Sequence, residues 1–399
     1  MNETIKEQSQ ALRPHLSSLQ TRALIVGVVG LAATAFGYVS NSEQFFRSYL
    51  IGFSFWLSLS VGSLGILMVH HLAGGRWGFT IRRPLEAGAR TFAVMLLLFV
   101  PVLLGVNSLY EWTNEELVAA DALLQYKTFY LNVPYFTGRA LAYFVVWIVL
   151  GFLLSRWSAA QDETQETHFI RKMQLTSGPG MILLFLSGTL AVIDWIMSLE
   201  PHWYSSMYGV IYIVGGGLFT WAFMILVTTN LAKRAPFDRI MTNQTQKDLG
   251  TFLLACVMLW AYTSFSQFLI IWSGNLPEEV TWYMRRLGEG WINVGVLLLA
   301  FHFAVPFMLL VSSRIKARTK LLVTIAIGMI VMHYVDIYWN TAPAFHHYHF
   351  SWMDLTAPVG IGGIWVAFFF SQLKTRSLIA LNDPRFEDLL SGEDEHHHG

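Results

Sequence analysis

The sequence is poor in cysteine and in charged residues. One cysteine, Cys256, stands among 399 residues. It excludes an intrachain disulfide, a CxxCH haem attachment site and a cysteine-ligated iron–sulfur cluster. Charged residues make up 13% of the chain and hydrophobic residues 54%, whereas a soluble domain usually carries about 25% charged residues. The composition therefore excludes an ordinary soluble globular protein and indicates a membrane protein.

Neither sign of charge predominates. Lys and Arg together number 26, as do Asp and Glu, so there is no basic excess of the kind that indicates a nucleic-acid partner. The basic residues are unevenly placed, however. Most lie in the N-terminal segment, in the loops after every second apolar run and in the C-terminal segment, including Arg82, Arg83, Lys233 and Arg234. The positive-inside rule then predicts that both termini are cytoplasmic.

Ten apolar runs are long enough to be membrane spans. A polar segment, 1–22, precedes the first run, 23–39; the others lie near 48–72, 85–108, 133–156, 176–199, 207–232, 249–273, 290–313, 320–340 and 353–373. These nine are about 20–27 residues long, enough to cross a roughly 30 Å hydrocarbon core. A cleaved signal peptide is the alternative interpretation of the first run. We favour an uncleaved helix, because nine spans would remain after cleavage.

Two related stretches indicate a duplication. Asp194 precedes Pro201, and Asp336 precedes Pro343, at the same spacing. Sliding the second half over the first also superposes Ser313–Arg314 on Ser155–Arg156. We therefore predict an all-α membrane protein with two same-orientation four-helix bundles, formed by helices 2–5 and 6–9 and flanked by helices 1 and 10. The predicted divisions are a tail (1–22), helix 1 and its loop (23–47), the first bundle (48–205), the second bundle (206–345), an exterior loop and helix 10 (346–373), and a tail (374–399).

Ionisable residues within apolar runs are the main candidates for function. A charge at the bilayer centre costs roughly 2.5–3.5 kcal/mol, so such residues usually have a partner or a role. We expect an outer cluster and a path leading inward from it. The outer cluster comprises Asp194, Asp336, His333 and Arg139, with Glu200, His202, Arg285 and Glu289 at the rim; the path continues through His302, Tyr262 and Gln267 to His70 and His71 at the inner end of helix 2.

A proton relay is the chemistry that this set favours. A buried carboxylate beside a histidine can take up and release protons near neutral pH, and His333, Asp336 and Asn340 share one helical face. The alternative is structural, with the two aspartates paired to Arg139 or to backbone amides and the remaining polar groups packed between helices. The glycine runs 215–217 and 360–363 lie inside apolar spans, so we interpret them as sites of close helix approach.

Bound metal is not favoured. A haem would need His302 and His333 to face each other, and their predicted depths differ. His346, His347 and His349 include ligand types suited to copper or zinc, but a lone exterior histidine cluster among aromatics is more often a surface or subunit contact. We therefore predict no cofactor, metal or catalytic residue in this chain.

Two stretches of the sequence resemble those of a known family of membrane proteins. The sequences VIDWIMSLEPHWYSSMYG (192–209) and WSGNLPEEVTWYMRR (272–286), within ten spans, resemble the NrfD/polysulfide-reductase-C-like membrane subunits, especially those of bacterial alternative complex III. The resemblance covers nearly the whole chain. It implies a non-catalytic inner-membrane subunit of a quinol:electron-acceptor oxidoreductase, without redox cofactors of its own and with a proton-conducting path.

The same resemblance implies a set of partners. These are a homologous membrane subunit of the ActC type that holds the quinol site, exterior iron–sulfur and multihaem cytochrome c subunits, other small membrane subunits, lipids and, as a further candidate, a terminal oxidase. Three rival functions stay open at this stage. They are a quinol pocket at the outer cluster with Asp194 accepting a proton, a structural anchor for exterior redox subunits, and a free-standing secondary transporter.

Overall fold

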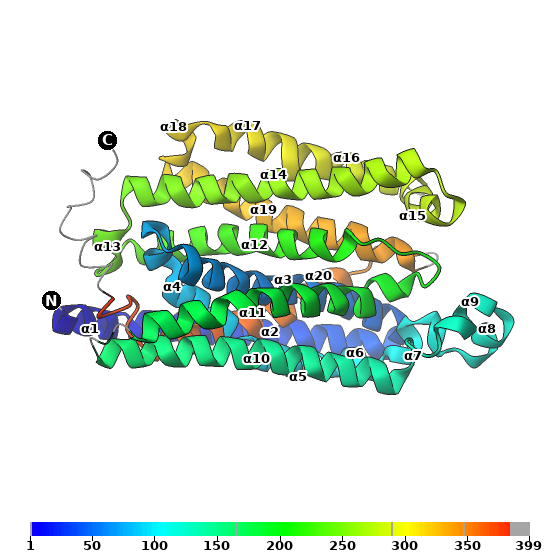
Figure 1. The fold of residues 1–399 in the computed structure, drawn as a ribbon, viewed down its shortest axis with the longest axis horizontal. Coiled ribbons are helices and arrows are strands. Elements are labelled where there is room, and N and C mark those ends of the chain that lie inside the picture. The colour runs from blue at the N-terminus through cyan, green and yellow to red at the C-terminus, as the bar shows by residue number, and fades with distance from the viewer. Residues whose placement is uncertain (1, 165, 167, 289, 346–347, 384–399) are drawn as a thin grey trace.

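A computed structural model of the chain describes residues 2–164, 166, 168–288, 290–345 and 348–383. Within these ranges the regular structure is helical, and ten helices are long and apolar enough to cross a membrane (Figure 1). The prediction of an all-α, ten-span membrane protein is confirmed.

Several spans are divided into shorter helices. In chain order the ten are α1 with α2 (Asn2–Ala11, Arg13–Ser40), α3 (Ser42–Ala73), α4 to α6 (Arg76–Ala89, Phe92–Leu98, Val100–Leu104), α10 (Val133–Glu163), α11 with η2 (His168–Trp195, Met197–Leu199), α12 (Tyr208–Leu231), α14 (Asn243–Gly274), α16, η3 and α17 (Trp291–Leu298, Leu299–Ala304, Val305–Val311), α19 with η4 (Thr319–Thr341, Ala342–Ala344), and α20 (Met353–Leu373). Connecting segments contain α7 (Val106–Leu109), η1 (Glu111–Thr113), α8 (Glu115–Ala120), α9 (Ala122–Lys127), α13 (Phe237–Ile240), α15 (Pro277–Leu287) and α18 (Ser313–Lys316).

The two groups of four helices pack by equivalent contacts. In the first group α3 contacts α4 and α11, and in the second α12 contacts α14 and α19. The first helix of each group also contacts the last helix of the other, α3 with α19 and α12 with α11. This exchange symmetry is the arrangement that a duplicated four-helix unit produces when its two copies face each other.

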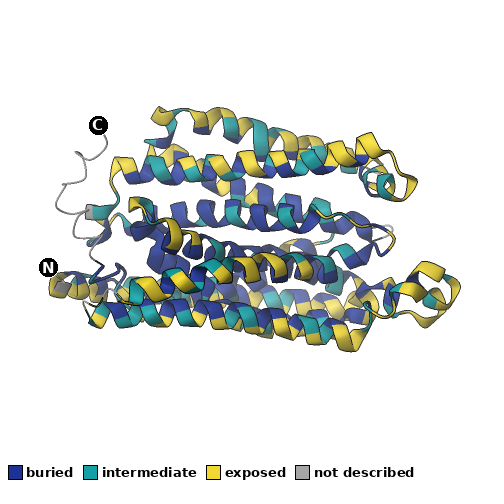
Figure 2. Ribbon diagram, viewed as in Figure 1, coloured by how far each residue is buried: buried dark blue, intermediate teal, exposed yellow. Residues whose placement is uncertain are grey.

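The helices α3 and α12 form the centre of the molecule. Both are largely buried, whereas α10 and α14 expose residues along their outward faces (Figure 2). Small residues bring the two central backbones together, because a Cβ at Gly216 would lie only 2.5 Å from the Ser58 carbonyl oxygen. A Cβ at Gly360 of α20 would likewise lie close to the α2 backbone, 2.5 Å from the Leu31 nitrogen. The expectation of close approach at both glycine runs is confirmed.

Both terminal segments lie at one end of the bundle. The hydroxyl of Ser9 accepts a hydrogen bond from the Leu378 backbone N–H at 3.3 Å. Residues 378–381 are buried beneath the ends of the helices. The polar segment 1–22, expected to be a tail, is largely helical in its described part: it forms α1, and α2 begins within it at Arg13.

One expectation about this end is wrong. The basic pattern places Arg82 and Arg83 in the loop between the second and third spans, but both lie on α4 and are buried. The apolar run near 85–108 marks only the part of the span that lies deep in the membrane. The helix begins about two and a half turns earlier, where its charged side chains find partners inside the protein.

Candidate functional site

Asp194 is held by a close set of donors within the first bundle. It lies near the end of α11 and is 0% exposed. Arg139 of α10 donates to both carboxylate oxygens, from Nε to Oδ2 at 2.8 Å and from Nη2 to Oδ1 at 3.0 Å. The Tyr143 hydroxyl donates to Oδ2 at 2.8 Å. A bidentate arginine and a phenol fix the carboxylate in place. This environment matches the structural alternative for Asp194, in which it pairs with Arg139, better than it matches a proton relay.

Asp336 has a different environment in the second bundle. It is 4% exposed on α19 and accepts hydrogen bonds from Trp260 Nε1 to Oδ2 at 3.2 Å and from Asn340 Nδ2 to Oδ1 at 3.0 Å. Neither donor is charged. The imidazole of His333 is close by, with its Nδ1 4.0 Å from Oδ2. No cation among the described residues pairs with this carboxyl group, so of the two aspartates Asp336 is the candidate for exchanging a proton.

The sequence contains a reason for this difference. In the alignment that superposes Ser313–Arg314 on Ser155–Arg156, Leu297 takes the place of Arg139. The second bundle therefore lacks the guanidinium that neutralises its aspartate in the first. Removing a cation from a buried pair leaves the carboxyl to neutralise itself by binding a proton.

Two histidines complete what we call the Asp336 cluster, which consists of Ser58, Trp260, His302, His333, Asp336 and Asn340. The His333 and His302 rings are both 0% exposed, with centroids 6.2 Å apart. His333 Nε2 lies 3.0 Å from the Ser58 hydroxyl of α3. The remaining nitrogen of His333 and both nitrogens of His302 have no hydrogen-bond partner among the described residues. Buried polar atoms of this kind are normally satisfied by internal water.

A local irregularity places His302 in this cluster. It lies in the π-helix η3, which is followed at once by α17 with Pro306 near its start. Proline has no N–H to donate to the carbonyl of His302, four residues earlier, and its ring crowds that carbonyl. A π-turn re-routes the backbone bonds around the gap, and such turns are frequent at functional sites. The helix thus turns His302 against Trp260, with ring centroids 4.2 Å apart.

A chain of polar contacts joins Asp336 to the loop-bearing end of the bundle. Arg286 of α15 is 1% exposed and donates to the Asn340 carbonyl at 2.8 Å and to Glu200 at 3.4 Å. Glu200 also accepts from Arg285, which is partly exposed. Burial lowers the pKa of the Arg286 guanidinium, and Glu200 opposes that shift. These contacts connect the cluster, through Asn340, to groups that reach solvent.

A small cavity adjoins this chain of contacts. Its volume is about 10 Å³, and its lining includes Tyr208, Tyr212, Asp336, Asn340 and Thr341. The Thr341 hydroxyl is buried and has no hydrogen-bond partner among the described residues. The exposed lining is mostly apolar, and a space of this size accommodates about one water molecule. A single water here could bridge the carboxyl group and the hydroxyls around it.

The structure does not gather all the predicted residues into one site. Asp194 and Arg139 form a pair in the first bundle, separate from Asp336. Tyr262 is 68% exposed on the outer face of α14, and Gln267 bonds Ser205 near the loops. His202 is exposed and lies 2.6 Å from Asp121.

The remaining predicted residues lie at the two ends or outside the described part. His71 is buried about 20 Å along α3 from Ser58, at about 1.5 Å rise per residue. His70 packs beside it, with ring centroids 5.8 Å apart. Glu289, His346 and His347 lie outside the described residues.

Sequence reasoning missed three members of these sites. Trp260 and Ser58 bind the cluster from α14 and α3, and Tyr143 completes the Asp194 pair. Tyr143 could have been found, because it lies one turn from Arg139 on the same helical face. Nothing in the linear pattern marks Ser58 among the many serines of its helix.

No protein-family model matches the chain, and no curated protein matches it. The fold and the site themselves define its class. It is a multi-pass helical membrane protein with a buried carboxyl group and two buried imidazoles at the centre of one of its two helix bundles.

Proposed function

We propose that this chain is a membrane subunit of a bacterial quinol:electron-acceptor oxidoreductase of the alternative complex III type. Within the NrfD/polysulfide-reductase-C-like group it corresponds to the ActF type of membrane subunit. It resides in the inner membrane with both termini in the cytoplasm. It conducts protons while partner subunits with haem c and iron–sulfur clusters carry electrons from quinol.

One observation carries the proton-conducting part of this proposal. Of two aspartates at matching sequence positions, Asp194 is neutralised by Arg139, whereas Asp336 is buried beside imidazoles and pairs with no cation among the described residues. A carboxyl group so placed can alternate between its neutral and ionised forms as its surroundings change. Keeping such a group inside a membrane protein is costly, and relays are a common reason for it.

The contacts suggest the order of the path. Protons reach Asp336 from the loop-bearing end by way of Glu200, Asn340 and the adjacent cavity. His333 stands next along the helix, and His302 lies beyond it. Both histidines have nitrogens available to water, and a neutral imidazole can accept a proton on one nitrogen and release it from the other.

The size of the cavity favours protons over quinol at this position. A cavity of about 10 Å³ beside Asp336 suits one water, whereas small-molecule sites are usually clefts of about 300–1,000 Å³. Asp194, the candidate acceptor in a quinol pocket, has both its oxygens occupied by Arg139 and Tyr143. We therefore place the quinol site, as the family resemblance implies, in the homologous ActC-type subunit.

The test uses the intact complex in liposomes and compares Asp336→Leu and Asp336→Asn with the unmodified protein. We expect proton translocation per electron to fall severalfold while the amount of assembled complex changes little. The contrasting variant is Asp194→Asn, which should reduce assembly and leave the translocation ratio of the surviving complex unchanged. Equal losses of assembly and translocation in the Asp336 variants would contradict a relay and favour a structural anchor.

A further inference from the structure

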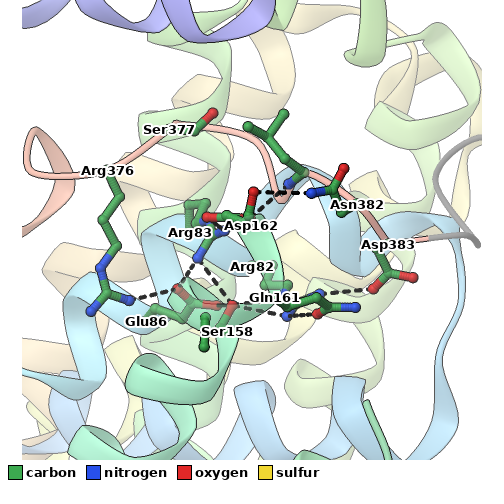
Figure 3. A network of polar contacts seen from close by, with 12 residues as sticks. Arg82, Arg83, Glu86, Ser158, Gln161, Asp162, Arg376, Ser377, Asn382 and Asp383 are labelled. Carbon is green, nitrogen blue, oxygen red and sulfur yellow. Dashed lines mark hydrogen bonds and ion pairs between the residues drawn. The ribbon is translucent and has the colours of Figure 1, made fainter. Parts of the chain in front are cut away.

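An arginine-rich network closes the end of the bundle where the terminal segments meet. Figure 3 shows two neighbouring residues of α4, Arg82 and Arg83, pointing toward acidic partners from other elements. Arg82 pairs with Asp383 at 2.9 Å, and Arg83 pairs with Glu86 at 2.7 Å. The network also includes Ser158, Gln161 and Asp162 of α10 and Arg376 after α20.

The charges of this network balance without Arg90. Three guanidinium groups face three carboxylates, and all six take part in ion pairs; they are Arg82, Arg83, Arg376, Glu86, Asp162 and Asp383. Arg90 lies two turns beyond Arg83 on the same face of the span. Its half-buried side chain makes no hydrogen bond or ion pair with any residue that the structure describes. Among the described residues Arg90 thus adds one positive charge beyond the three ion-paired carboxylates, with Glu86 as its nearby acidic neighbour.

A pocket opens beside this additional charge. It lies between α4 and the end of α20, and its lining includes Arg83, Glu86, Arg90, Gln372, Arg376 and Ser377. Three guanidiniums and one carboxylate give it a positive character. Its volume is about 10 Å³, so it can seat the oxygens of an anion while the rest of the ligand lies outside.

The position of the pocket indicates the kind of anion. The apolar span α20 ends at Leu373, and Arg376 follows it directly, which places the pocket at the depth of the lipid phosphates. Arg90 starts deeper, but its long side chain can reach outward with its stem in the apolar layer. Basic pockets between transmembrane helices at this depth bind anionic head groups. Guanidinium groups bind phosphate oxygens in paired hydrogen bonds.

We propose that this pocket binds a phosphate monoanion, the phosphodiester of an anionic phospholipid. One such group neutralises the single charge of Arg90. It would link the inner ends of α4 and α20 to the C-terminal segment that carries Arg376. Free inorganic phosphate shares this chemistry, and the experiment separates the two sources. The proposal does not depend on proton conduction.

The test measures lipid retention by the purified complex in nanodiscs and in detergent. Arg90→Gln removes the additional charge and breaks no ion pair, so the fold should persist. Arg156→Gln is the matched control, because Arg156 is exposed at the same end of the bundle and outside the pocket. Native mass spectrometry counts the phospholipids that remain after delipidation, and thermal melting is followed with phosphatidylglycerol, phosphatidylcholine or inorganic phosphate added.

We expect Arg90→Gln to weaken phosphatidylglycerol binding by at least about tenfold, the effect of losing a charge-assisted hydrogen bond. Arg156→Gln should bind phosphatidylglycerol like the unmodified protein. The affinity of Arg90→Lys should lie between those of Arg90→Gln and Arg156→Gln, because lysine keeps the positive charge but cannot donate the paired hydrogen bonds of a guanidinium. Stabilisation by inorganic phosphate that Arg90→Gln abolishes would assign the site to free phosphate. The proposal would be overturned if Arg90→Gln bound phosphatidylglycerol as well as Arg156→Gln does, and also bound phosphate as well as Arg156→Gln does.

Discussion

At the scale of single residues, the presence or absence of one arginine separates two otherwise matching aspartates. Asp194 with Arg139 is a buried ion pair whose geometry leaves little freedom to either partner. Asp336 accepts only neutral donors. The same residue type therefore stabilises one bundle and provides a titratable group in the other, because the chemistry is set by the partner.

Asp194→Asn should destabilise the protein. The substitution leaves the Arg139 guanidinium without its counter-charge, and removing one member of a buried pair costs about 3–5 kcal/mol. Because Arg139 is 19% exposed, we expect the lower part of that range. Thermal unfolding of the purified complex measures the change. Tyr143→Phe is the control and should cost only about 1 kcal/mol, the value of one hydrogen bond; equal stability of Asp194→Asn and the unmodified protein would show that the pair is unimportant.

At the scale of elements, irregular segments position the site residues. The π-helix η3 turns His302 toward Trp260, and the amphipathic helix α15 brings Arg286 over the end of α19. Regular helices supply the frame of the second bundle. The proposed proton path depends on the few turns where that regularity is interrupted.

Pro306→Ala should raise stability and lower proton translocation. Alanine restores an N–H that can bond the His302 carbonyl, and it removes the ring that disfavours a regular helix by about 3 kcal/mol. The π-turn would then relax and rotate His302 away from Trp260. Thermal melting and the proton-to-electron ratio of the reconstituted complex measure the two effects. If the π-turn is lost and the proton-to-electron ratio is unchanged, His302 is not part of the proton path.

The short helix α9, in the connection between the third and fourth spans, should be sensitive to pH. Asp121 accepts from the Leu123 and Leu124 N–H groups at its start, and the Leu124 bond and His202 lower the pKa of the Asp121 carboxyl. A lowered pKa means that the ionised form stabilises this helix above the usual carboxyl pKa, and that the stabilisation is lost as pH falls below it. Asp121→Ala should therefore speed amide exchange in α9 more at pH 6 than at pH 3. Equal effects at both pH values would contradict this account.

At the scale of the whole molecule, the interface between the two bundles depends on close backbone contact. Gly216 of α12 lies directly against Ser58 of α3, the residue that also binds His333. Both the packing of the halves and the position of the Asp336 cluster thus depend on one helix crossing.

Gly216→Ala should weaken this crossing. The added methyl group would lie 2.5 Å from the Ser58 carbonyl oxygen, and overpacking of this kind costs about 1–3 kcal/mol. Gly217→Ala is the matched control, since its Cβ would meet only Cys256 Sγ at 3.9 Å. Thermal stability of the two variants checks the prediction. Equal melting temperatures would show that the helices can move apart without loss.

The sequence predicts the frame of the molecule better than it predicts the sites. Apolar length alone identifies all ten spans, because each must cross the same hydrocarbon layer. The contacts within the Asp336 cluster could not be predicted, since Ser58, Trp260 and His302 come from three other spans and meet His333 or Asp336 only through helix packing. Arg82 and Arg83 are misplaced by sequence because their charges, paired inside the fold, look like those of a loop.

The most direct test of the central claim follows the protonation of Asp336 during turnover. Infrared difference spectroscopy of the intact complex, reduced with quinol, reports the C=O stretch of a protonated carboxyl group. We predict a carboxyl band that changes with turnover, disappears in Asp336→Asn and persists in Asp194→Asn. A band that survives Asp336→Asn unchanged, or no carboxyl signal at all, would contradict the assignment of Asp336 as the proton carrier.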